Sequence, residues 1–182
     1  AQFNNGEQAV VAYTYDELGQ LSGKTYGTGA HAIHETMDYN MQGWLTEKSS
    51  ELFEMKLRYY DPEPYYGGDA YYTGNISEWW WQHKNVNGNY DADNNTYIFH
   101  YDDLSRLNDS RLTYNESEDI TDEFVENGIT YDKNSNIITL NRSSLSSDDM
   151  KSYRFSYSGS QRIKDETSNS DYEYDANGNI HK

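Results

Sequence analysis

The sequence predicts an all-β fold in which tandem antiparallel β-hairpins form an open, curved and strongly twisted sheet. A short unit, Tyr-Asp/Asn-x-x-Gly/Ser, recurs along the chain, and such self-similarity is typical of repeat proteins. Aromatic and polar residues alternate around the copies, as they do in a half-buried strand. Tyrosine supplies 19 of the 182 residues, so packed tyrosine rings must replace much of the usual aliphatic core.

The copies share an aromatic first residue, a polar second residue and an apolar last residue. They are Tyr15–Leu21, Tyr39–Leu45, a shortened Tyr72–Ile76, Tyr101–Leu107, Tyr131–Ile137, a degraded Tyr157–Ile163 and Tyr174–Ile180. Most steps between them are about twenty to thirty residues, which fits one hairpin and a variable connection. Because the chain stops within a unit, soon after Ile180, we expect it to be a fragment of a larger protein.

Each copy encodes a tight turn. Asp16 at the first corner of a type I turn can accept bonds from the following backbone, and Gly19 supplies the positive φ of the next bulge. Ser105 and Ser135 replace that glycine at a cost of about 1 kcal/mol, so their turns should be weaker or of another type. The remaining predicted turn residues are Asn40, Gly43, Gly74, Asp102, Asp132, Asp175 and Gly178.

The predicted elements follow one another within a single domain, residues 1–182. Two hairpins turn at 16–19 and 40–43, a strand follows from Leu52 to Tyr59, and a surface loop at 61–69 contains both prolines, which lack an amide donor. Next come a shortened hairpin from Tyr71 to Gln82, a polar loop from Asn85 to Asn95, and a hairpin pairing 97–101 with 106–112. An acidic connection at 115–123 and a Ser/Asp-rich stretch at 143–149 separate two further hairpins and a final half unit.

The charge and composition exclude several classes of partner. The formal charge of −17 disfavours nucleic acid, whose binding requires clustered Lys and Arg, and anionic membrane surfaces. Without a run of about eighteen apolar residues, membrane insertion is not expected. The chain has no cysteine, which removes disulfides and thiolate metal sites, and no cofactor is expected.

Candidate catalytic and metal-binding groups have simpler explanations. The 31 Asp and Glu residues fall mostly in turns and loops, whereas a glycan-cleaving enzyme needs two carboxylates at a set separation in space. Asp91–Asn95 resembles the opening of a calcium loop, but Thr96 occupies the position that requires glycine. The histidines form no zinc motif; they are His31, His34, His83, His100 and His181.

Three consecutive tryptophans, Trp79 to Trp81, form the candidate contact surface. In a strand Trp79 and Trp81 face one way and Trp80 the other. A ring on a solvent face would offer a stacking platform for a sugar or another chain. With both faces covered, all three rings would be core. Trp44 is a further candidate contact.

With its units placed on hairpins, the chain resembles the RHS/YD-repeat family of large bacterial surface and secreted proteins. The matching segments are Tyr15-Asp16…Gly19-Gln20-Leu21, Tyr101–Leu107, Gly128–Ile137 and Tyr174–Ile180. The resemblance implies a long strip of hairpins, which in this family can wind into a hollow shell around a C-terminal toxin domain. The family's Pro- and Arg-containing end motif is absent, and seven units are too few to enclose a cargo.

We therefore expect a non-enzymatic scaffold module of an exported RHS/YD-repeat protein, located at the cell surface or secreted as the resemblance implies. The expected partners are the remainder of the parent chain and a glycan or another protein, and unpaired edge strands favour self-association. A carbohydrate-binding module that uses exposed Trp and Tyr rings is the first alternative. A glycan-cleaving enzyme is the second.

Overall fold

The computed structural model describes residues 11–85, 87–114, 121, 123–144, 149–158, 161–165, 170–175 and 179–180. Within these residues lie thirteen β-strands, and a short 3-10 turn, η1 (Gly29–His31), precedes β3. The strands are β1 (Val11–Tyr15), β2 (Leu21–Tyr26), β3 (Ile33–Tyr39), β4 (Leu45–Ser50), β5 (Phe53–Arg58), β6 (Glu78–Lys84), β7 (Tyr90–Tyr101), β8 (Leu107–Tyr114), β9 (Glu126–Tyr131), β10 (Ile137–Arg142), β11 (Lys151–Ser158), β12 (Gln161–Asp165) and β13 (Ser170–Asp171). No described segment forms a helix long and apolar enough to cross a membrane.

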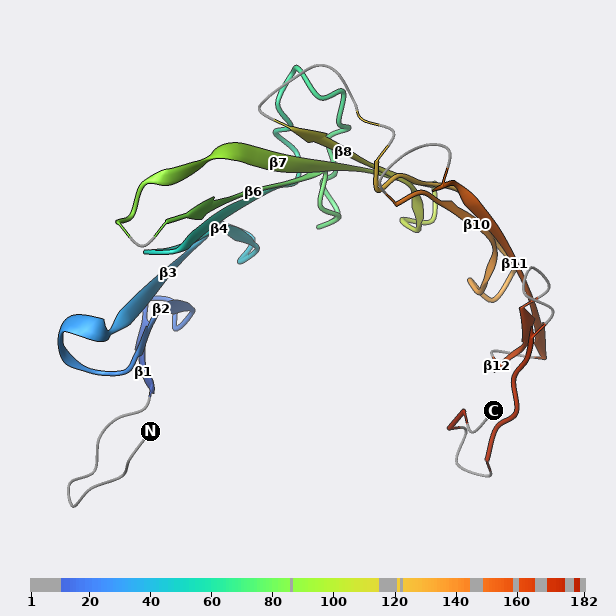
Figure 1. Cartoon of the computed structure of the whole chain (residues 1–182), viewed down its shortest axis with the longest axis horizontal. Coiled ribbons are helices and arrows are strands. Elements are labelled where there is room, and N and C mark those ends of the chain that lie inside the picture. Colours follow the sequence, from blue (N-terminus) through green and yellow to red (C-terminus); the bar gives the residue numbers. More distant parts are fainter. Residues whose placement is uncertain are drawn as a thin grey trace. The chain divides into compact units, whose positions relative to one another are not determined.

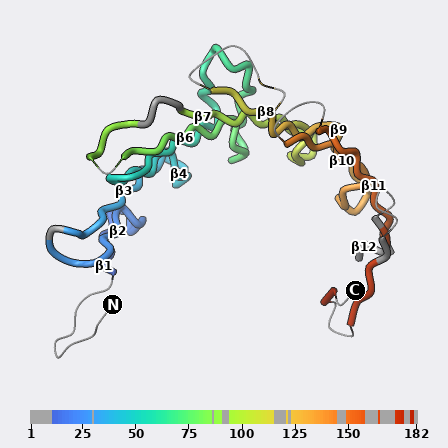
Figure 2. The backbone as a smooth tube through the Cα atoms, in the orientation of Figure 1, coloured from blue at the N-terminus to red at the C-terminus, as the bar shows by residue number. Residues whose placement is uncertain are grey.

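The strands pair in the order in which they occur in the sequence, from β1 to β13 (Figures 1 and 2). The pairings from β1 to β6 and from β8 to β13 are antiparallel. Among the described strands, β1 and β13 each have a single neighbour, so the sheet is open. The predicted all-β class of tandem antiparallel hairpins in an open sheet is confirmed.

Backbone contacts divide the chain into two compact units. Unit 1 comprises Ala1–Pro62 and Ala70–Thr96, and unit 2 comprises Glu63–Asp69 and Tyr97–Lys182. A single folding domain over residues 1–182 stays a prediction.

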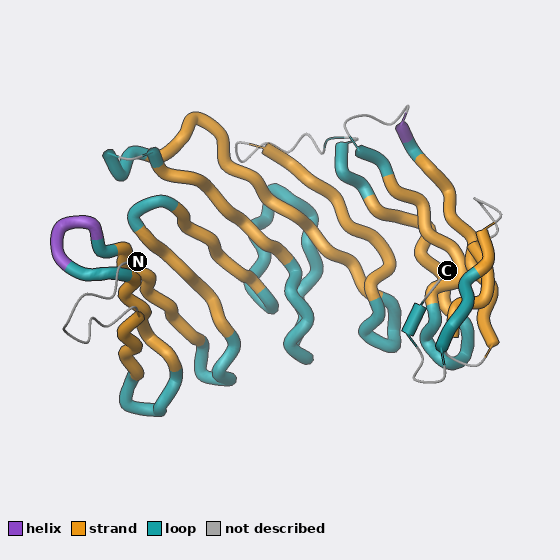
Figure 3. The backbone as a smooth tube through the Cα atoms, turned by 60° about the horizontal axis from the view of Figure 1, so that its bottom comes forward, coloured by secondary structure: helices purple, strands orange, loops and turns teal. Residues whose placement is uncertain are grey.

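The first two predicted hairpins are present in unit 1. β1 and β2 are joined by the turn at Asp16–Gly19, and β3 and β4 by the turn at Asn40–Gly43. Both glycines have positive φ, 79° at Gly19 and 80° at Gly43. The bulge that this conformation requires appears as a register shift at the strand ends. In Figure 3 the teal turns of these hairpins lie at the same border of the sheet.

Strand β6 pairs with β5, so the shortened hairpin predicted from Tyr71 to Gln82 is wrong. The register places Trp81 opposite Met55 and Trp80 opposite Lys56. Residues 59–77 connect the two strands and include the predicted loop at 61–69. Pairing with β5 buries more apolar area of the three tryptophans than pairing with the short polar segment after Tyr71 would. This explains why β6 pairs with β5.

The polar loop predicted from Asn85 to Asn95 is shorter than expected, because residues 90–95 belong to β7. A capped turn precedes this strand, and the sequence interpretation missed it. The Oδ1 atom of Asn85 accepts the amides of Asn87 and Asn89, and Gly88 has φ of 76°. Residues 91–95, which resemble the opening of a calcium loop in the sequence, are therefore part of a strand.

Unit 2 contains the predicted hairpins that turn at 102–105 and 132–135. A further turn begins at Asp175, whose amide donates to the carbonyl of Asn179 at 2.9 Å. Gly178, the predicted positive-φ residue of that turn, lies outside the described residues.

The two serine turns have the same geometry as the glycine turns. Ser105 and Ser135 have φ of 60° and 64°, and each amide donates to the carbonyl of the turn aspartate. The expectation of a different turn type is therefore wrong. The expectation that these turns are weaker stays a prediction.

The two units differ in how they bury apolar side chains. In unit 2, Ile98 is 0% and Leu112 3% exposed, and Val125, Ile129 and Phe155 are also buried. Among the described residues of unit 1, the buried hydrophobic side chains are Met37 and Tyr59. The packing of unit 1 therefore depends more on half-buried aromatic rings than that of unit 2 does.

Replacing Gly19 with valine should lower the denaturant midpoint, by about 1–2 kcal/mol in unfolding free energy. A Cβ at Gly19 would meet no atom within 4 Å, so the cost is that of the left-handed backbone alone. Asparagine tolerates this region, and Gly19→Asn is the matched control with a smaller loss. Ser105→Gly should leave the midpoint unchanged or raise it. The opposite order of midpoints would contradict the turn assignment.

Candidate functional site

A single side-chain oxygen holds each turn of the repeat. The Oδ1 atom of Asp102 accepts the amides of Leu104 and Arg106 at 2.9 and 3.0 Å. Equivalent pairs of bonds are made by the side chains of Asp16, Asn40, Asn85 and Asp132. For Asp175, the structure gives the second of the two, to Asn179. These predicted site residues are thus engaged in turn formation.

Three tyrosine hydroxyls connect a hairpin to the one before it. Tyr39 donates to the carbonyl of Leu21 at 3.0 Å, and Tyr59 donates to that of Leu45 at 2.8 Å. In unit 2, Tyr131 donates to the carbonyl of Leu107 at 2.6 Å. Burial raises the pKa of Tyr59 and Tyr131, so both hydroxyls stay protonated and able to donate.

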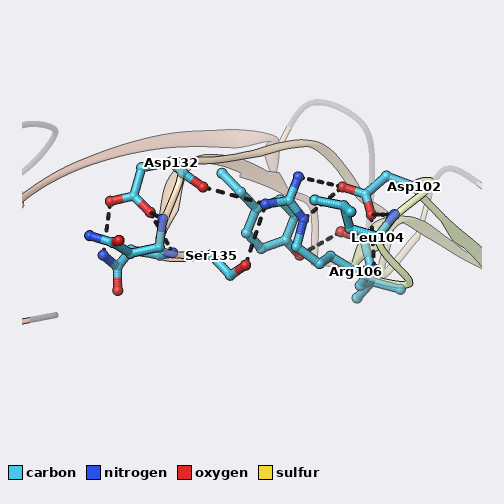
Figure 4. Close-up of polar contacts among 9 residues, drawn as sticks. Asp102, Leu104, Arg106, Asp132 and Ser135 are labelled. Atoms are coloured by element: carbon cyan, nitrogen blue, oxygen red, sulfur yellow. Dashed lines mark hydrogen bonds and ion pairs between the residues drawn. The ribbon is translucent and has the colours of Figure 1, made fainter.

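Arg106 adds a second connection between two hairpins of unit 2 (Figure 4). Its Nε and Nη2 atoms lie 2.8 and 2.7 Å from Oδ2 of Asp102. Its Nη1 atom lies 3.4 Å from the carbonyl oxygen of Asp132 and 3.5 Å from Oγ of Ser135. The guanidinium also lies 4.4 Å from the ring centroid of Tyr131, a cation–π distance. Arg106 therefore contacts both turns at once.

The turn carboxylates of these two hairpins are stabilised in the charged form. Hydrogen bonds from the Arg106 side chain and amide hold the pKa of Asp102 below its usual range. The pKa of Asp132 is lowered by a bond from the Asn136 side chain, whose Nδ2 donates at 2.8 Å. Both groups therefore serve as fixed acceptors.

The three tryptophans alternate across the sheet as predicted, and all three are half-buried. The rings of Trp79 and Trp81 lie 4.6 Å apart on one face. On the other face, Lys56 Nζ lies 5.1 Å from the ring centroid of Trp80. Each of the three rings therefore has at least one neighbouring side chain.

Trp44 packs within unit 1 rather than projecting from it. Its ring centroid lies 5.0 Å from that of Tyr59. A Cβ at Gly74 would come within 3.2 Å of the Trp44 ring, and Gly74 has φ of 96°. Glycine is therefore favoured at position 74 for two reasons. It lets the backbone approach the Trp44 ring closely, and it adopts the positive φ that the sequence predicted.

A buried carboxylate lies on the Trp80 side of unit 1. Glu54 is 7% exposed and accepts from the hydroxyl of Tyr90. Lys56 and Lys84 lie 3.1 and 3.3 Å from its two oxygens. Burial alone would raise the pKa of Glu54, but these three donors outweigh burial and lower it. The group is a satisfied ion-pair network.

Unit 2 contains a polar hollow of about 430 Å³ that the sequence interpretation missed. His100 on β7 stands between two acceptors, with Nδ1 3.3 Å from Oδ1 of Asp109 and Nε2 3.3 Å from the carbonyl of Gly67. Arg111 Nε donates to the same Asp109 oxygen at 2.7 Å. The available sequence signal was the spacing of Asp109 and Arg111, which places both on one face of a strand.

The other histidines are dispersed. His34 Nδ1 lies 3.1 Å from Oγ1 of Thr25, and the His83 ring lies 5.5 Å from that of Phe53. His31 lies in η1, and His181 is outside the described residues. Over the part of the chain that the structure describes, no group of three or more His, Asp or Glu side chains is placed to hold a metal ion.

No family model matches the chain, and no curated protein matches it. The functional assignment therefore rests on the arrangement of the chain's own residues. Two features of that arrangement bear on function: the repeated bonds between hairpins and the polar hollow.

Removing the Tyr131 hydroxyl should destabilise the chain. Tyr131→Phe leaves the Leu107 carbonyl without its 2.6 Å donor, at a cost of about 0.5–1.5 kcal/mol in unfolding free energy. Tyr15→Phe is the matched control, since Tyr15 holds the same place in the first repeat and is 63% exposed. Urea unfolding of both variants measures the difference. Equal losses would contradict the bond between hairpins.

Asp102→Asn should reduce the acid sensitivity of the fold. Because the folded-state pKa of Asp102 is lowered, its ion pair stabilises the chain above the unfolded value near 3.9. That stability is lost as pH falls through the folded pKa. Asparagine keeps Oδ1 as the turn acceptor, as Asn40 does. The variant should therefore be less stable at neutral pH, with a smaller further loss in acid.

Urea midpoints measured from neutral pH down to about pH 2 test this dependence on the Asp102 carboxylate. Asp103→Asn is the control, because the exposed Asp103 carboxylate makes no hydrogen bond or ion pair with the described residues. Its acid profile should follow that of the unaltered chain. An unchanged profile for Asp102→Asn would show that the ion pair does not contribute.

Proposed function

We propose that the chain is a non-enzymatic structural scaffold module, part of a β-hairpin wall in an exported bacterial RHS/YD-repeat protein. The observation that supports this proposal is the recurring hydrogen bond from a tyrosine hydroxyl to a backbone carbonyl of the preceding hairpin. Three hairpins are thereby attached to their predecessors, and stability accumulates between neighbours as in other repeat arrays.

The use of the recurring polar groups in the repeat also favours a scaffold over an enzyme. Asp16, Asp102 and Asp132 accept backbone amides of their own turns. The tyrosine that precedes the turn Asn or Asp donates to the neighbouring hairpin at Tyr39 and Tyr131. Side chains committed to such bonds are poorly suited to proton transfer, because a general acid or base must reach its substrate.

The proposed partner is the remainder of the parent chain, which would extend the row of hairpins and be exposed at the cell surface or secreted with it. Strand β1 offers a site for such extension, because β2 is its one neighbour among the described strands. Its Tyr13 and Tyr15 are 56% and 63% exposed. Self-association through the same edge is the competing use of this strand.

Native-state hydrogen exchange tests the scaffold proposal. Tyr39→Phe removes the bond to Leu21 and should lower amide protection in β1–β4 while leaving β9 and β10 unchanged, because repeat arrays couple nearest neighbours. An equal loss of protection in both places would contradict stacking hairpin by hairpin.

Tryptophan fluorescence titrated with a glycan panel tests the alternative of a carbohydrate-binding module based on aromatic rings. The four tryptophans all belong to unit 1. A scaffold predicts no saturable change in their emission. A saturable change that Trp80→Phe abolishes would favour the alternative.

A further inference from the structure

We propose that the polar hollow of unit 2 is a saccharide subsite, which goes beyond the scaffold role. Three strands and one loop of unit 2 border it, and its volume of about 430 Å³ is within the range of small-molecule sites, about 300–1,000 Å³. The ligand class follows from the atoms that the hollow leaves available.

The carboxylate of Asp109 has one occupied and one available oxygen. Its side chain is 13% exposed. Arg111 Nε and His100 Nδ1 both approach Oδ1, and no described group bonds Oδ2. His100 also contacts the carbonyl of Gly67, which fixes the orientation of its ring. Two side chains, His100 and Arg111, therefore hold the Asp109 carboxylate in place. Oδ2 is therefore a fixed acceptor at the hollow.

Donors stand beside this acceptor. Arg111 uses Nε for Asp109 and is 45% exposed, and its two terminal nitrogens bond no described residue. The exposed amide of Asn108 also lines the hollow and is not engaged by the described residues. An acceptor next to several donors matches a vicinal diol, because each hydroxyl both donates and accepts.

The charges around the hollow disfavour ionic ligands. Asp109 and Arg111 already form an ion pair at 2.7 Å. A second carboxylate, Asp69, lines the hollow and would repel an anion, whereas Arg111 would repel a cation. A neutral ligand with many hydroxyl groups avoids both penalties. Tyr101, also in the lining, adds an aromatic side chain against which the C–H groups of a sugar ring can pack.

A glycine, Gly128, contributes to the lining of the hollow. Gly128 lies within β9 with φ of 58°. A Cβ there would come within 2.6 Å of Nδ2 of Asn141, which donates to Oδ1 of Asn127. Glycine within a strand often marks a place where a ligand approaches the backbone closely.

Amide NMR of the full chain tests the proposal, with the methyl glycosides of glucose, mannose and galactose as probes. At least one should produce saturable shifts at the amides of Gly128, Asn108 and Tyr101, without shifts at the indole N–H groups of unit 1. Cyclohexanol, a six-membered ring with one hydroxyl, should produce no saturable shift. Saturable binding of glycine without binding of any glycoside would identify a zwitterion site and overturn the proposal.

Two variants locate the binding. Asp109→Asn and Arg111→Met should each weaken affinity for the glycoside at least about tenfold, since each removes hydrogen bonds that involve a charged group. Arg111 is partly exposed, so this variant keeps the test valid if Asp109→Asn fails to fold. Asp103→Asn makes the same charge change outside the hollow and should bind normally. Unchanged affinity in a folded variant, or no shifts with any probe glycoside, would overturn the proposal. Neither result bears on the exchange test of the scaffold.

Discussion

The register of the hairpins depends on one atom per repeat, the Oδ1 oxygen of the turn Asp or Asn. By accepting two backbone amides, this oxygen fixes which residue takes the positive φ and where the bulge falls. A slip of one residue would move every side chain of a strand to the opposite face. The tyrosine hydroxyls reach the preceding hairpin because the register places them there. The packing between hairpins therefore depends on the register that the turn oxygen sets.

Once the register is set, a small hydrophobic core suffices. Unit 1 buries Met37 and Tyr59, and its remaining aromatic rings are half-buried and in contact, as with Trp44 beside Tyr59. Such rings contribute area and also need hydroxyl or indole partners. The bond from Tyr59 to Leu45 meets this need at the backbone. This explains how a chain with 35% hydrophobic residues forms an ordered sheet.

Local chemistry made the turns and the fold class predictable, whereas pairing over longer distances was not. The turns at Asp16 and Asn40 follow from side-chain-to-backbone bonds within five residues. The pairing of β6 with β5 depends on apolar area brought together across residues 59–77, and a short Tyr-Thr-Gly segment misled the sequence interpretation. The start of β7 at Tyr90 was missed because Asn and Asp disfavour strands intrinsically. The hollow around Asp109 is also lined by Asp69, which lies far from it in the sequence.

The bonds that Tyr39, Tyr59 and Tyr131 donate to the preceding hairpin all have a backbone carbonyl as acceptor, and this has a consequence for the repeat as a whole. A carbonyl is present whatever side chain its residue carries, so a neighbouring repeat can change its sequence without losing the bond. The degraded copies are then compatible with continued stacking. Residues on the strand faces are correspondingly free to differ between repeats. The His100, Asp109 and Arg111 cluster occupies such positions, which is how a structural repeat can carry a binding site in one place and none in another.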